Sequence, residues 1–234
     1  MIDLHSHVLP GIDDGAKTFE NSIAIARELS EQGVTDLIAT PHFICDTIYT
    51  SPRSDNTKLL EQLQQKLKEE GIDINVYLGN ELYIDENIRK LIENKTVSSL
   101  ADSEYVLLEF PLNNAYPNYE DIIGDLIQSG YKVVLAHPER YAITQNDFQI
   151  LVDLYDMGVL MQCNLGSFLG KYDKHAEKTA VKLAKNKMIY GLGSDIHHVR
   201  RDDGVLKAIK RLKKYYREDE LDKLLNENPR KIIK

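Results

Sequence analysis

The sequence has few cysteines, no long apolar run and fewer basic than acidic residues. Its two cysteines, Cys45 and Cys163, are too few for a disulfide framework. No stretch approaches about 18 consecutive apolar residues, so no membrane-spanning helix is expected. Acidic residues number 37 against 29 basic ones, and the net charge of −8 argues against a general attraction to nucleic acid or anionic lipid.

The N-terminus and the overall composition narrow the class further. Met1–His5 has neither the basic nor the apolar region of a signal peptide. Apolar residues make up 42% of the 234 residues and charged residues 28%, which is typical of a globular protein. No linker or low-complexity run interrupts the chain. We therefore expect a cytoplasmic protein, not embedded in a membrane and not bound to nucleic acid, with one domain over residues 1–234.

Short apolar segments alternate with amphipathic ones along the whole chain. The predicted strands are Ile2–His5, Asp36–Thr40, Asn75–Leu78, Tyr105–Phe110, Lys132–Ala136, Leu160–Cys163 and Met188–Gly191. The predicted helices are Glu20–Gln32, Ser54–Glu70, Asp85–Asn94, Tyr119–Ser129, Asn146–Met157, His175–Asn186, Gly204–Lys214 and Asp219–Asn226. This alternation implies parallel strands with right-handed crossovers. It favours a (β/α) barrel of seven strands, and the alternative is an open doubly wound sheet.

Polar side chains that bind metals follow nearly every predicted strand. Histidine or carboxylate residues stand at six of the seven strand ends: His5, His7, His42, Glu81, Glu109, His137, Asp195 and His197. Asp13 and Asp14 lie in the loop after the first strand and can join them. The carboxyl ends of barrel strands share one face, which carries the active site in such folds. His5 and His7 are two residues apart, so both can face one metal ion.

Any one of these residues has a simpler interpretation. A single histidine at a strand end is usually solvated or bonded to the backbone, and an Asp or Glu there is often a helix cap. Their joint placement is harder to explain, because clustered carboxylates without cations would cost several kcal/mol each in repulsion and desolvation. Imidazole nitrogen together with carboxylate oxygen suits catalytic Mn, Fe or Zn. We therefore predict a metal centre.

With these residues assembled, the chain resembles the PHP (polymerase and histidinol phosphatase) superfamily. More narrowly, it is similar to bacterial metal-dependent protein-tyrosine phosphatases of the CpsB/CapC/YwqE type, which act in capsule and exopolysaccharide regulation. The resemblance implies an α/β fold, a distorted (β/α)7 TIM-like barrel. The motifs that carry it are Met1–His7 with Asp13-Asp14-Gly15, Ala39-Thr40-Pro41-His42, Gly79-Asn80-Glu81, Leu107-Leu108-Glu109-Phe110, Ala136-His137-Pro138-Glu139-Arg140-Tyr141, Gly193-Ser194-Asp195-Ile196-His197 and Asn228-Pro229-Arg230.

The resemblance also implies a centre of three metal ions. The first ion would be held by His5, His7, Glu81 and Asp195, and the second by Glu81, Glu109 and His137. The third would be held by Asp14, His42 and His197. The family favours manganese. The sequence itself does not select the metal, since these ligands also accept Fe or Zn.

The implied reaction is hydrolysis of a phosphotyrosine monoester by a hydroxide that bridges two metal ions. Arg140 and Arg200 are the candidates for binding the phosphoryl oxygens, because guanidinium offers paired donors. Arg140 alternatively forms a surface ion pair, and Arg200 and Arg201 alternatively form a solvated basic turn. The basic run Lys207–Arg217 has apolar residues at helical spacing and reads as a solvated helix face.

The expected partner is a phosphotyrosine protein, and the resemblance points to the tail of a bacterial tyrosine kinase. A thiol phosphatase is disfavoured, since the residues six positions after Cys45 and Cys163 are Ser51 and Leu169 rather than arginine. Three alternatives stay open. In the first, the chain is another PHP phosphoesterase, such as a histidinol-phosphate or small-molecule phosphatase. In the second, it is a metal-dependent nuclease, which its acidity disfavours. In the third, it is an inactive module that docks on a tyrosine kinase.

Overall fold

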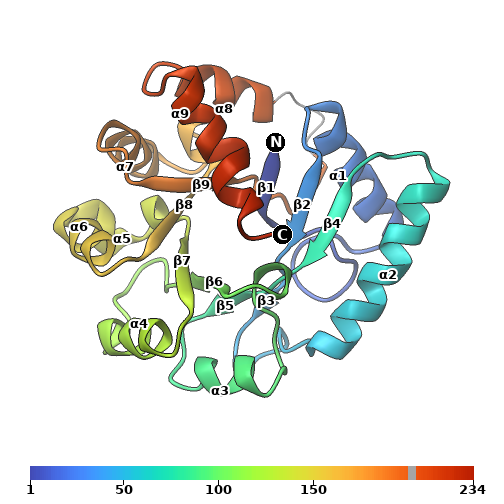
Figure 1. Ribbon diagram of the computed structural model, residues 1–234, viewed down its shortest axis with the longest axis horizontal. Helices are drawn as coiled ribbons and strands as arrows, with labels where there is room; N and C mark the ends of the chain where they lie inside the picture. The colour runs from blue at the N-terminus through green and yellow to red at the C-terminus, as the bar shows by residue number, and fades with distance from the viewer. Residues whose placement is uncertain (200–203) are drawn as a thin grey trace.

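Parallel strands form the centre of the molecule and helices surround them (Figure 1). The computed structural model describes residues 1–199 and 204–234. The strands of this part of the chain are β1 (Ile2–Ser6), β2 (Asp36–Ala39), β3 (His42–Phe43), β4 (Asn75–Leu78), β5 (Glu81–Tyr83), β6 (Tyr105–Glu109), β7 (Lys132–Ala136), β8 (Leu160–Asn164) and β9 (Ile189–Gly193). They pair in the orders β1-β2-β4 and β3-β5-β6-β7-β8-β9.

The two sheets together trace the predicted barrel. β3 follows β2 after Thr40-Pro41, and β5 follows β4 after Gly79-Asn80. Each pair is therefore one strand of the barrel, interrupted by two residues. At the other edge, a parallel bridge joins Ser6 to Ile196, just beyond β9, and so leads back to β1. The seven predicted strands are therefore confirmed, with two of them interrupted. The sequence did not predict β3 and β5 as separate strands, because both are too short to show a pattern.

The helices of the described residues are α1 (Phe19–Glu31), α2 (Arg53–Glu69), α3 (Ile88–Glu93), α4 (Tyr119–Gln128), α5 (Ala142–Asn146), α6 (Gln149–Asp156), α7 (Lys174–Lys185), α8 (Gly204–Leu212), α9 (Glu218–Asp222) and α10 (Asn228–Arg230). Short 3-10 turns are η1 (Leu100–Asp102), η2 (Pro138–Arg140) and η3 (Leu165–Leu169), and η4 (Lys223–Glu227) is a π-helical turn. In these residues, every helix is too short or too polar to span a bilayer.

Two predicted helices begin at the wrong residue, and in both cases an aspartate side chain explains it. Asp85 Oδ1 accepts a hydrogen bond from Asn87 N, 2.8 Å away, so α3 starts three residues later than predicted. Asp147 Oδ1 accepts from Gln149 N at 2.9 Å, so α6 starts three residues later than predicted, and the short helix α5 before it was not predicted. Such local caps compete with the helix and are not visible in apolar periodicity.

Side chains along the strands alternate between two apolar clusters. On β6, Tyr105 and Leu107 belong to the smaller cluster, whereas Val106 and Leu108 belong to the larger one against the helices. The smaller cluster therefore lies inside the barrel, and the C-terminal Ile232 and Ile233 are part of it. Glu109 continues the inward alternation of β6 by one step, which places its carboxylate above this apolar interior.

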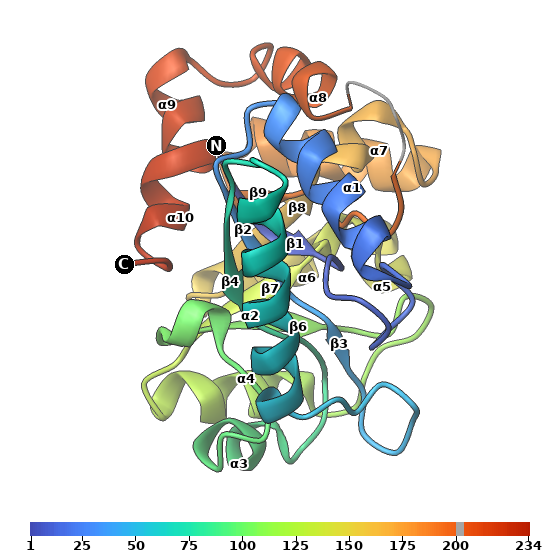
Figure 2. The same ribbon diagram turned by 90° about the vertical axis from the view of Figure 1, so that its right-hand side faces the viewer.

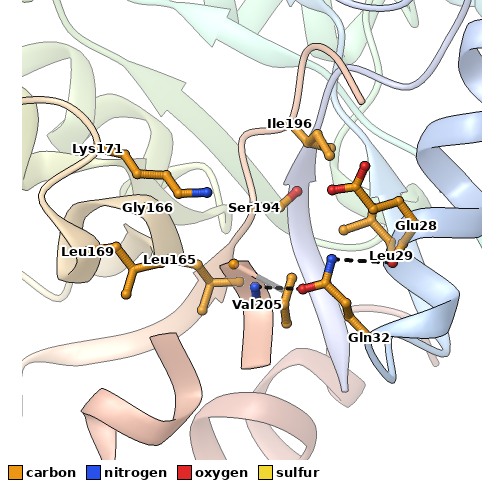
Figure 3. Close-up of a pocket in the computed structure, with 11 residues that line it drawn as sticks. Glu28, Leu29, Gln32, Leu165, Gly166, Leu169, Lys171, Ser194, Ile196 and Val205 are labelled. Carbon is orange, nitrogen blue, oxygen red and sulfur yellow. Dashed lines mark hydrogen bonds between the residues drawn. The ribbon is translucent and has the colours of Figure 1, made fainter. Parts of the chain in front are cut away.

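A small cavity lies where the helical ring comes back to α1 (Figure 3). Its volume of about 30 Å³ has room for about one water molecule. Val205 N, at the start of α8, donates to Gln32 Oε1 at the end of α1 over 2.8 Å. This bond joins the last part of the barrel to the first.

Candidate metal centre

The predicted side chains meet at the carboxyl ends of the strands. They come from β1 and the loop after it, from the starts of β3 and β5, from the end of β6 and the residue after β7, and from the segment after β9. The structure brings together all nine predicted ligands: His5, His7, Asp14, His42, Glu81, Glu109, His137, Asp195 and His197. Their role as ligands stays a prediction, and their proximity is observed.

His5, His7 and Glu81 form the innermost group. His5 Nε2 and His7 Nε2 are 3.1 Å apart, and they lie 3.1 Å and 3.3 Å from Glu81 Oε2. Asp195 Oδ1 is 3.6 Å from His5 Nε2 and 3.5 Å from His7 Nε2. All four residues are buried. This is the set that the resemblance assigns to the first ion.

Glu81 also faces the second group. Its Oε1 lies 2.9 Å from His137 Nε2, and Glu109 Oε1 lies 3.7 Å from the same nitrogen. His42 Nδ1 is 3.0 Å from Glu81 Oε2 and 3.5 Å from Glu109 Oε2. Glu81 can thus bridge two cations through its two oxygens, as the resemblance implies.

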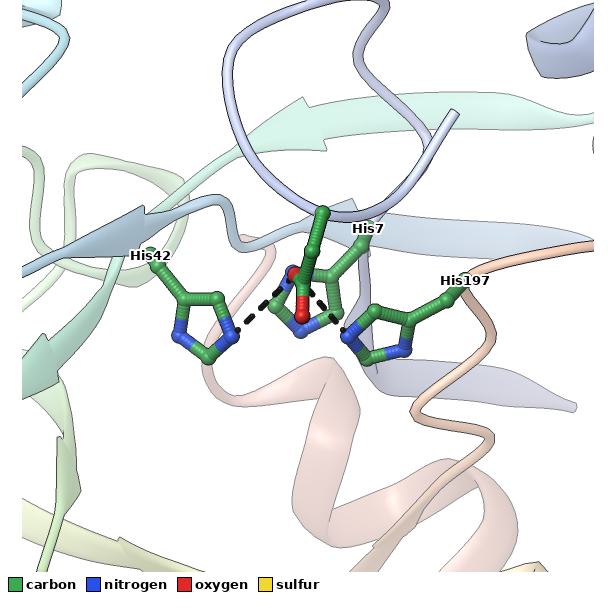
Figure 4. A group of neighbouring side chains, drawn as sticks. His7, His42 and His197 are labelled. Atoms are coloured by element: carbon green, nitrogen blue, oxygen red, sulfur yellow. Dashed lines mark ion pairs between the residues drawn. The ribbon is translucent and has the colours of Figure 1, made fainter. Parts of the chain in front are cut away.

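The third group is the most open one. Asp14 Oδ1 lies 3.5 Å from His42 Nε2 and 3.3 Å from His197 Nε2 (Figure 4). The imidazole of His7 stacks on that of His197 with ring centroids 4.0 Å apart. The Asp14 side chain is 50% exposed and that of His197 is 24% exposed, whereas Glu81 is fully buried. A ligand from solvent therefore reaches the centre from the side of Asp14 and His197.

Buried polar atoms without a well-formed hydrogen bond indicate that cations fit this cluster. Glu81 Oε2 and His42 Nδ1 are inaccessible to solvent and lie 3.0 Å apart, yet neither makes a hydrogen bond of good geometry. Burial favours the neutral form of His5, but the carboxylates of Glu81 and Asp195 outweigh it and raise its pKa to about 9. Burial, together with the charge of Glu81, raises the pKa of Glu109 to about 7. The imidazole nitrogens and carboxylate oxygens that bind these protons are also the atoms that coordinate divalent metals in proteins.

Two of these residues have unusual backbone conformations. His137 has φ 31° and Asp195 has φ 49°, both in the left-handed region that few residues other than glycine adopt. Such strain is concentrated at functional sites, where the surrounding structure enforces it. At Gly193, an added Cβ would lie 2.6 Å from His5 Cβ, so only glycine fits beside this histidine. The strands are thus packed closely to aim their side chains inward.

Two buried polar residues outside the predicted ligand set orient the histidines. Asp13 Oδ2 lies 2.8 Å from His7 Nδ1, and Gln162 Oε1 lies 2.9 Å from His5 Nδ1. In each ring this contact leaves Nε2 directed at the cluster. The sequence named Asp13, with Asp14, as able to join the cluster, but did not predict its contact with His7. The signal for Gln162 was a polar side chain between the apolar Met161 and Cys163 of β8.

Arg140 lies inside the site rather than in a surface ion pair. Its Nη1 is 2.8 Å from Asp195 Oδ2, and its guanidinium stacks over the Tyr172 ring at 4.3 Å. Asn164 Nδ2 donates to the same Asp195 oxygen at 2.7 Å, and the Tyr172 hydroxyl lies 3.3 Å from it. Asp195 therefore turns one oxygen to the histidines and the other to Arg140. Arg200 and Arg201 are outside the described residues.

The family model for capsular polysaccharide synthesis, CpsB/CapC, matches residues 1–234. The chain belongs to this CpsB/CapC family. YwqE of Bacillus subtilis (strain 168), a tyrosine-protein phosphatase, is 32% identical over all of this chain and 92% of its own length. CapC of Staphylococcus aureus, a putative tyrosine-protein phosphatase, is 30% identical over 93% of this chain and 86% of its own.

A solved structure of this family agrees with the fold. The structure is one of those of YwqE from Bacillus subtilis and CpsB from Streptococcus pneumoniae, which are metal-dependent tyrosine phosphatases. Its chain superimposes with a TM-score of 0.94 at 31% identity and covers 100% of this chain and 94% of its own. The predicted family and α/β barrel class are thereby confirmed.

Proposed function

We propose that this chain hydrolyses phosphotyrosine in proteins with the help of divalent metal ions. The observation that carries the proposal is the convergence of five histidines and four carboxylates at one end of the barrel, in a chain that belongs to the CpsB/CapC family. Its relatives YwqE and CpsB are tyrosine-protein phosphatases. The chain is accordingly assigned as a metal-dependent protein-tyrosine phosphatase.

The chain's own residues bind and orient the reactants. Bound metal ions supply Lewis-acid activation of water and neutralise phosphoryl charge. Asp14, His42 and His197 border the accessible side, so the phosphate group enters there. Burial disfavours the charged form of Arg140, but Asp195 outweighs it and raises the pKa of this guanidinium, which stays charged. Its ion pair with Asp195 engages Nη1, and its other N–H groups serve the phosphoryl oxygens.

Three finer assignments belong to the same proposal. The metal is manganese, which mixed imidazole and carboxylate ligands accept. The substrate is the tyrosine-containing tail of a bacterial kinase that regulates capsular or exopolysaccharide synthesis, as suits a family of capsule synthesis proteins. The location is the cytoplasm, where the unpaired thiols of Cys45 and Cys163 would stay reduced.

The test is a phosphatase assay on a phosphotyrosine peptide, with histidinol phosphate assayed in parallel. Purified protein is measured as prepared, after chelation, and after addition of Mn, Zn or Mg. We expect hydrolysis of the peptide to stop on chelation and to return best with Mn. Full activity after thorough chelation would contradict the metal mechanism. Faster turnover of histidinol phosphate than of the peptide would favour the other phosphoesterase class.

Histidine variants separate the metal site from general effects. His5→Ala should lower kcat/KM by at least about 100-fold, because metal charge stabilisation is worth several kcal/mol. The matched control is His175→Ala, since His175 is exposed near the start of α7 and is not in the cluster. The control should keep full activity. Equal activity of the two variants would refute the ligand assignment.

A further inference from the structure

A basic groove, distinct from the metal centre, lies between α7 and α8. Its volume is about 530 Å³, and five basic side chains line it: Lys174, Lys178, Lys182, Lys185 and Arg211. Glu177 is the one acidic side chain in the lining. The chain as a whole has a net charge of −8, so the sign of the charge in this groove is opposite to that of the protein.

The four lysines form a stripe on one side of α7. Their spacing of four, four and three residues places them within an arc of about 80° around the helix. The side of α7 that faces the barrel instead carries small and apolar residues, namely Ala176, Ala180, Leu183 and Ala184, all buried. The lysine stripe is therefore the solvent-exposed side of α7, and packing does not account for its composition.

Most of this positive charge is not neutralised by the protein. Arg211 pairs with Glu177, and Lys182 Nζ lies over the Phe148 ring, 3.9 Å from its centroid. For Lys174, Lys178 and Lys185, no carboxylate of residues 1–199 or 204–234 lies within ion-pair distance. Repulsion among like charges on one helix costs stability, which points to a negatively charged partner.

The stripe begins at the rim of the metal centre. Tyr172, whose hydroxyl lies 3.3 Å from Asp195 Oδ2, precedes α7 by two residues. Asp173 caps the helix, with its Oδ1 accepting from Ala176 N at 2.8 Å, and Lys174 is the first helical residue. α7 and α8 both pack against η3, and the ion pair between Glu177 on α7 and Arg211 on α8 links them; Figure 2 shows the two helices as neighbours. A chain bound at the metal centre can thus continue directly into the groove.

We infer that this groove binds an acidic segment of the protein substrate, next to its phosphotyrosine. The inference rests on the proposed phosphatase function. The stripe from Lys174 to Lys185 is about 16 Å long, which equals about five residues of extended peptide. Acidic residues a few positions from the phosphotyrosine, over a span of about five residues, therefore lie within reach of the lysines. The groove thus selects which phosphotyrosines are hydrolysed fastest.

A peptide fits the observations better than a lipid surface. The site is concave and is walled by two helices, whereas a membrane surface is flat. It also continues a site that binds protein-linked phosphate. Opposite charges across such an interface accelerate association and give specificity more than affinity. Binding to phosphatidylserine vesicles distinguishes a lipid surface from a peptide.

The test compares two phosphotyrosine peptides, one with Asp and Glu three to eight residues from the phosphotyrosine and one with Gln and Ser there. The groove variant is Lys174→Gln, Lys178→Gln and Lys185→Gln combined. The matched control is Lys68→Gln, Lys90→Gln and Lys223→Gln, at exposed lysines of other helical segments. Both variants change the net charge equally, and glutamine keeps helix propensity. Hydrolysis of p-nitrophenyl phosphate reports whether the chemistry itself is intact.

We expect the native protein to prefer the acidic peptide by roughly 10-fold in kcat/KM, as three exposed charge pairs can supply. The groove variant should lose this preference and keep its p-nitrophenyl phosphate activity, while the control variant retains both. The preference should shrink in 0.5 M salt. A fluorescent acidic peptide with unphosphorylated tyrosine should bind the native protein more tightly than the groove variant.

Three results would overturn the inference: no preference in the native protein, equal loss in both variants, or a groove variant that retains the preference but no longer binds phosphatidylserine vesicles. The last would assign the groove to a membrane surface. Absence of hydrolysis of any phosphotyrosine peptide would instead refute the proposed function. The direct binding measurement distinguishes that failure from failure of the groove, since it does not depend on turnover.

Discussion

Asp13 supports His7 from the side away from the metal cluster. Burial disfavours the charged form of Asp13, but its bond to His7 outweighs this and holds its pKa below the usual value, so the carboxylate stays ionised. Asp13 Oδ2 also accepts a hydrogen bond from His42 N at 3.2 Å, and Oδ1 accepts one from Gly15 N at 2.9 Å. One carboxylate thus fixes two predicted ligands and the loop that carries Asp14.

Replacing Asp13 by Asn should weaken metal binding. The amide oxygen can still accept from His7 Nδ1, but the negative charge that strengthens this histidine as a ligand is lost. We expect about 10-fold lower Mn affinity, measured by calorimetric titration of chelated protein. Asp73→Asn, at an exposed position, is the control. Unchanged affinity in Asp13→Asn would show that His7 does not need this support.

Asp3 is a buried carboxylate beneath the same cluster. Its Oδ1 accepts from Ser194 N at 2.8 Å and from His5 N at 3.2 Å, whereas Oδ2 has no partner. Burial raises the pKa of Asp3 to about 6. A carboxyl with a raised folded pKa favours folding most when both states are protonated. Its contribution is therefore complete below about pH 4 and is lost as the pH rises to about 6.

Replacing Asp3 by Asn should remove this pH dependence. Between pH 4 and pH 6, the free energy of unfolding of the chelated wild-type protein should fall by up to about 3 kcal/mol relative to that of Asp3→Asn. Asn keeps the acceptor for Ser194 N and His5 N. Urea unfolding at pH 4, 5, 6 and 7 measures the difference, and parallel curves for the two proteins would contradict the assignment.

At the scale of elements, the predictable part of the site was its position on the strands. Apolar alternation located β6, and the inward parity of Tyr105 and Leu107 leads directly to Glu109. In β1 the alternation of inward and outward side chains is broken. Leu4 belongs to the interior cluster, yet His5 and His7 also face inward. The pairing of β1 with β2 shifts register between Asp3 and Ser6. Periodicity cannot predict such a change of side, because it depends on the neighbouring strand.

Loops and short helices were less predictable for a related reason. η2 directly follows His137, whose left-handed φ of 31° turns the chain out of β7. Arg140, at the end of this turn, is thereby directed to Asp195, which follows β9, two strands away in the sheet. Only contacts between segments far apart in the sequence stabilise this conformation. The sequence could name Arg140 as a candidate, but it could not distinguish a surface ion pair from a place in the site.

At the scale of the whole molecule, the metal centre joins the first and last parts of the barrel. His5 lies in β1 and His7 follows it, and Asp195 and His197 follow β9, where the bridge between Ser6 and Ile196 completes the ring. The unfolded chain holds these groups apart. Metal ions held by this cluster would therefore favour the folded state, and their binding energy would add to the stability of the fold.

Chelation should accordingly lower the melting temperature. With Mn at about 100 times its dissociation constant, the stabilisation is about 2.7 kcal/mol. For a chain of this size, that corresponds to roughly 5 to 10 °C in Tm. Differential scanning fluorimetry with Mn and with a chelator measures the shift, and His5→Ala should show a much smaller one. An identical Tm under both conditions would mean that the cluster does not hold metal in the folded protein.

The sequence by itself determined the alternation of strands and helices, the barrel class and the identity of the polar residues at the strand ends. These features are local, because they follow from periodicity and residue type. Only the tertiary structure decided which atoms face one another: Glu81 between two groups, Asp195 between the histidines and Arg140, and Asp13 behind His7. Side-chain direction and backbone strain depend on packing between distant segments, and no single segment contains that information.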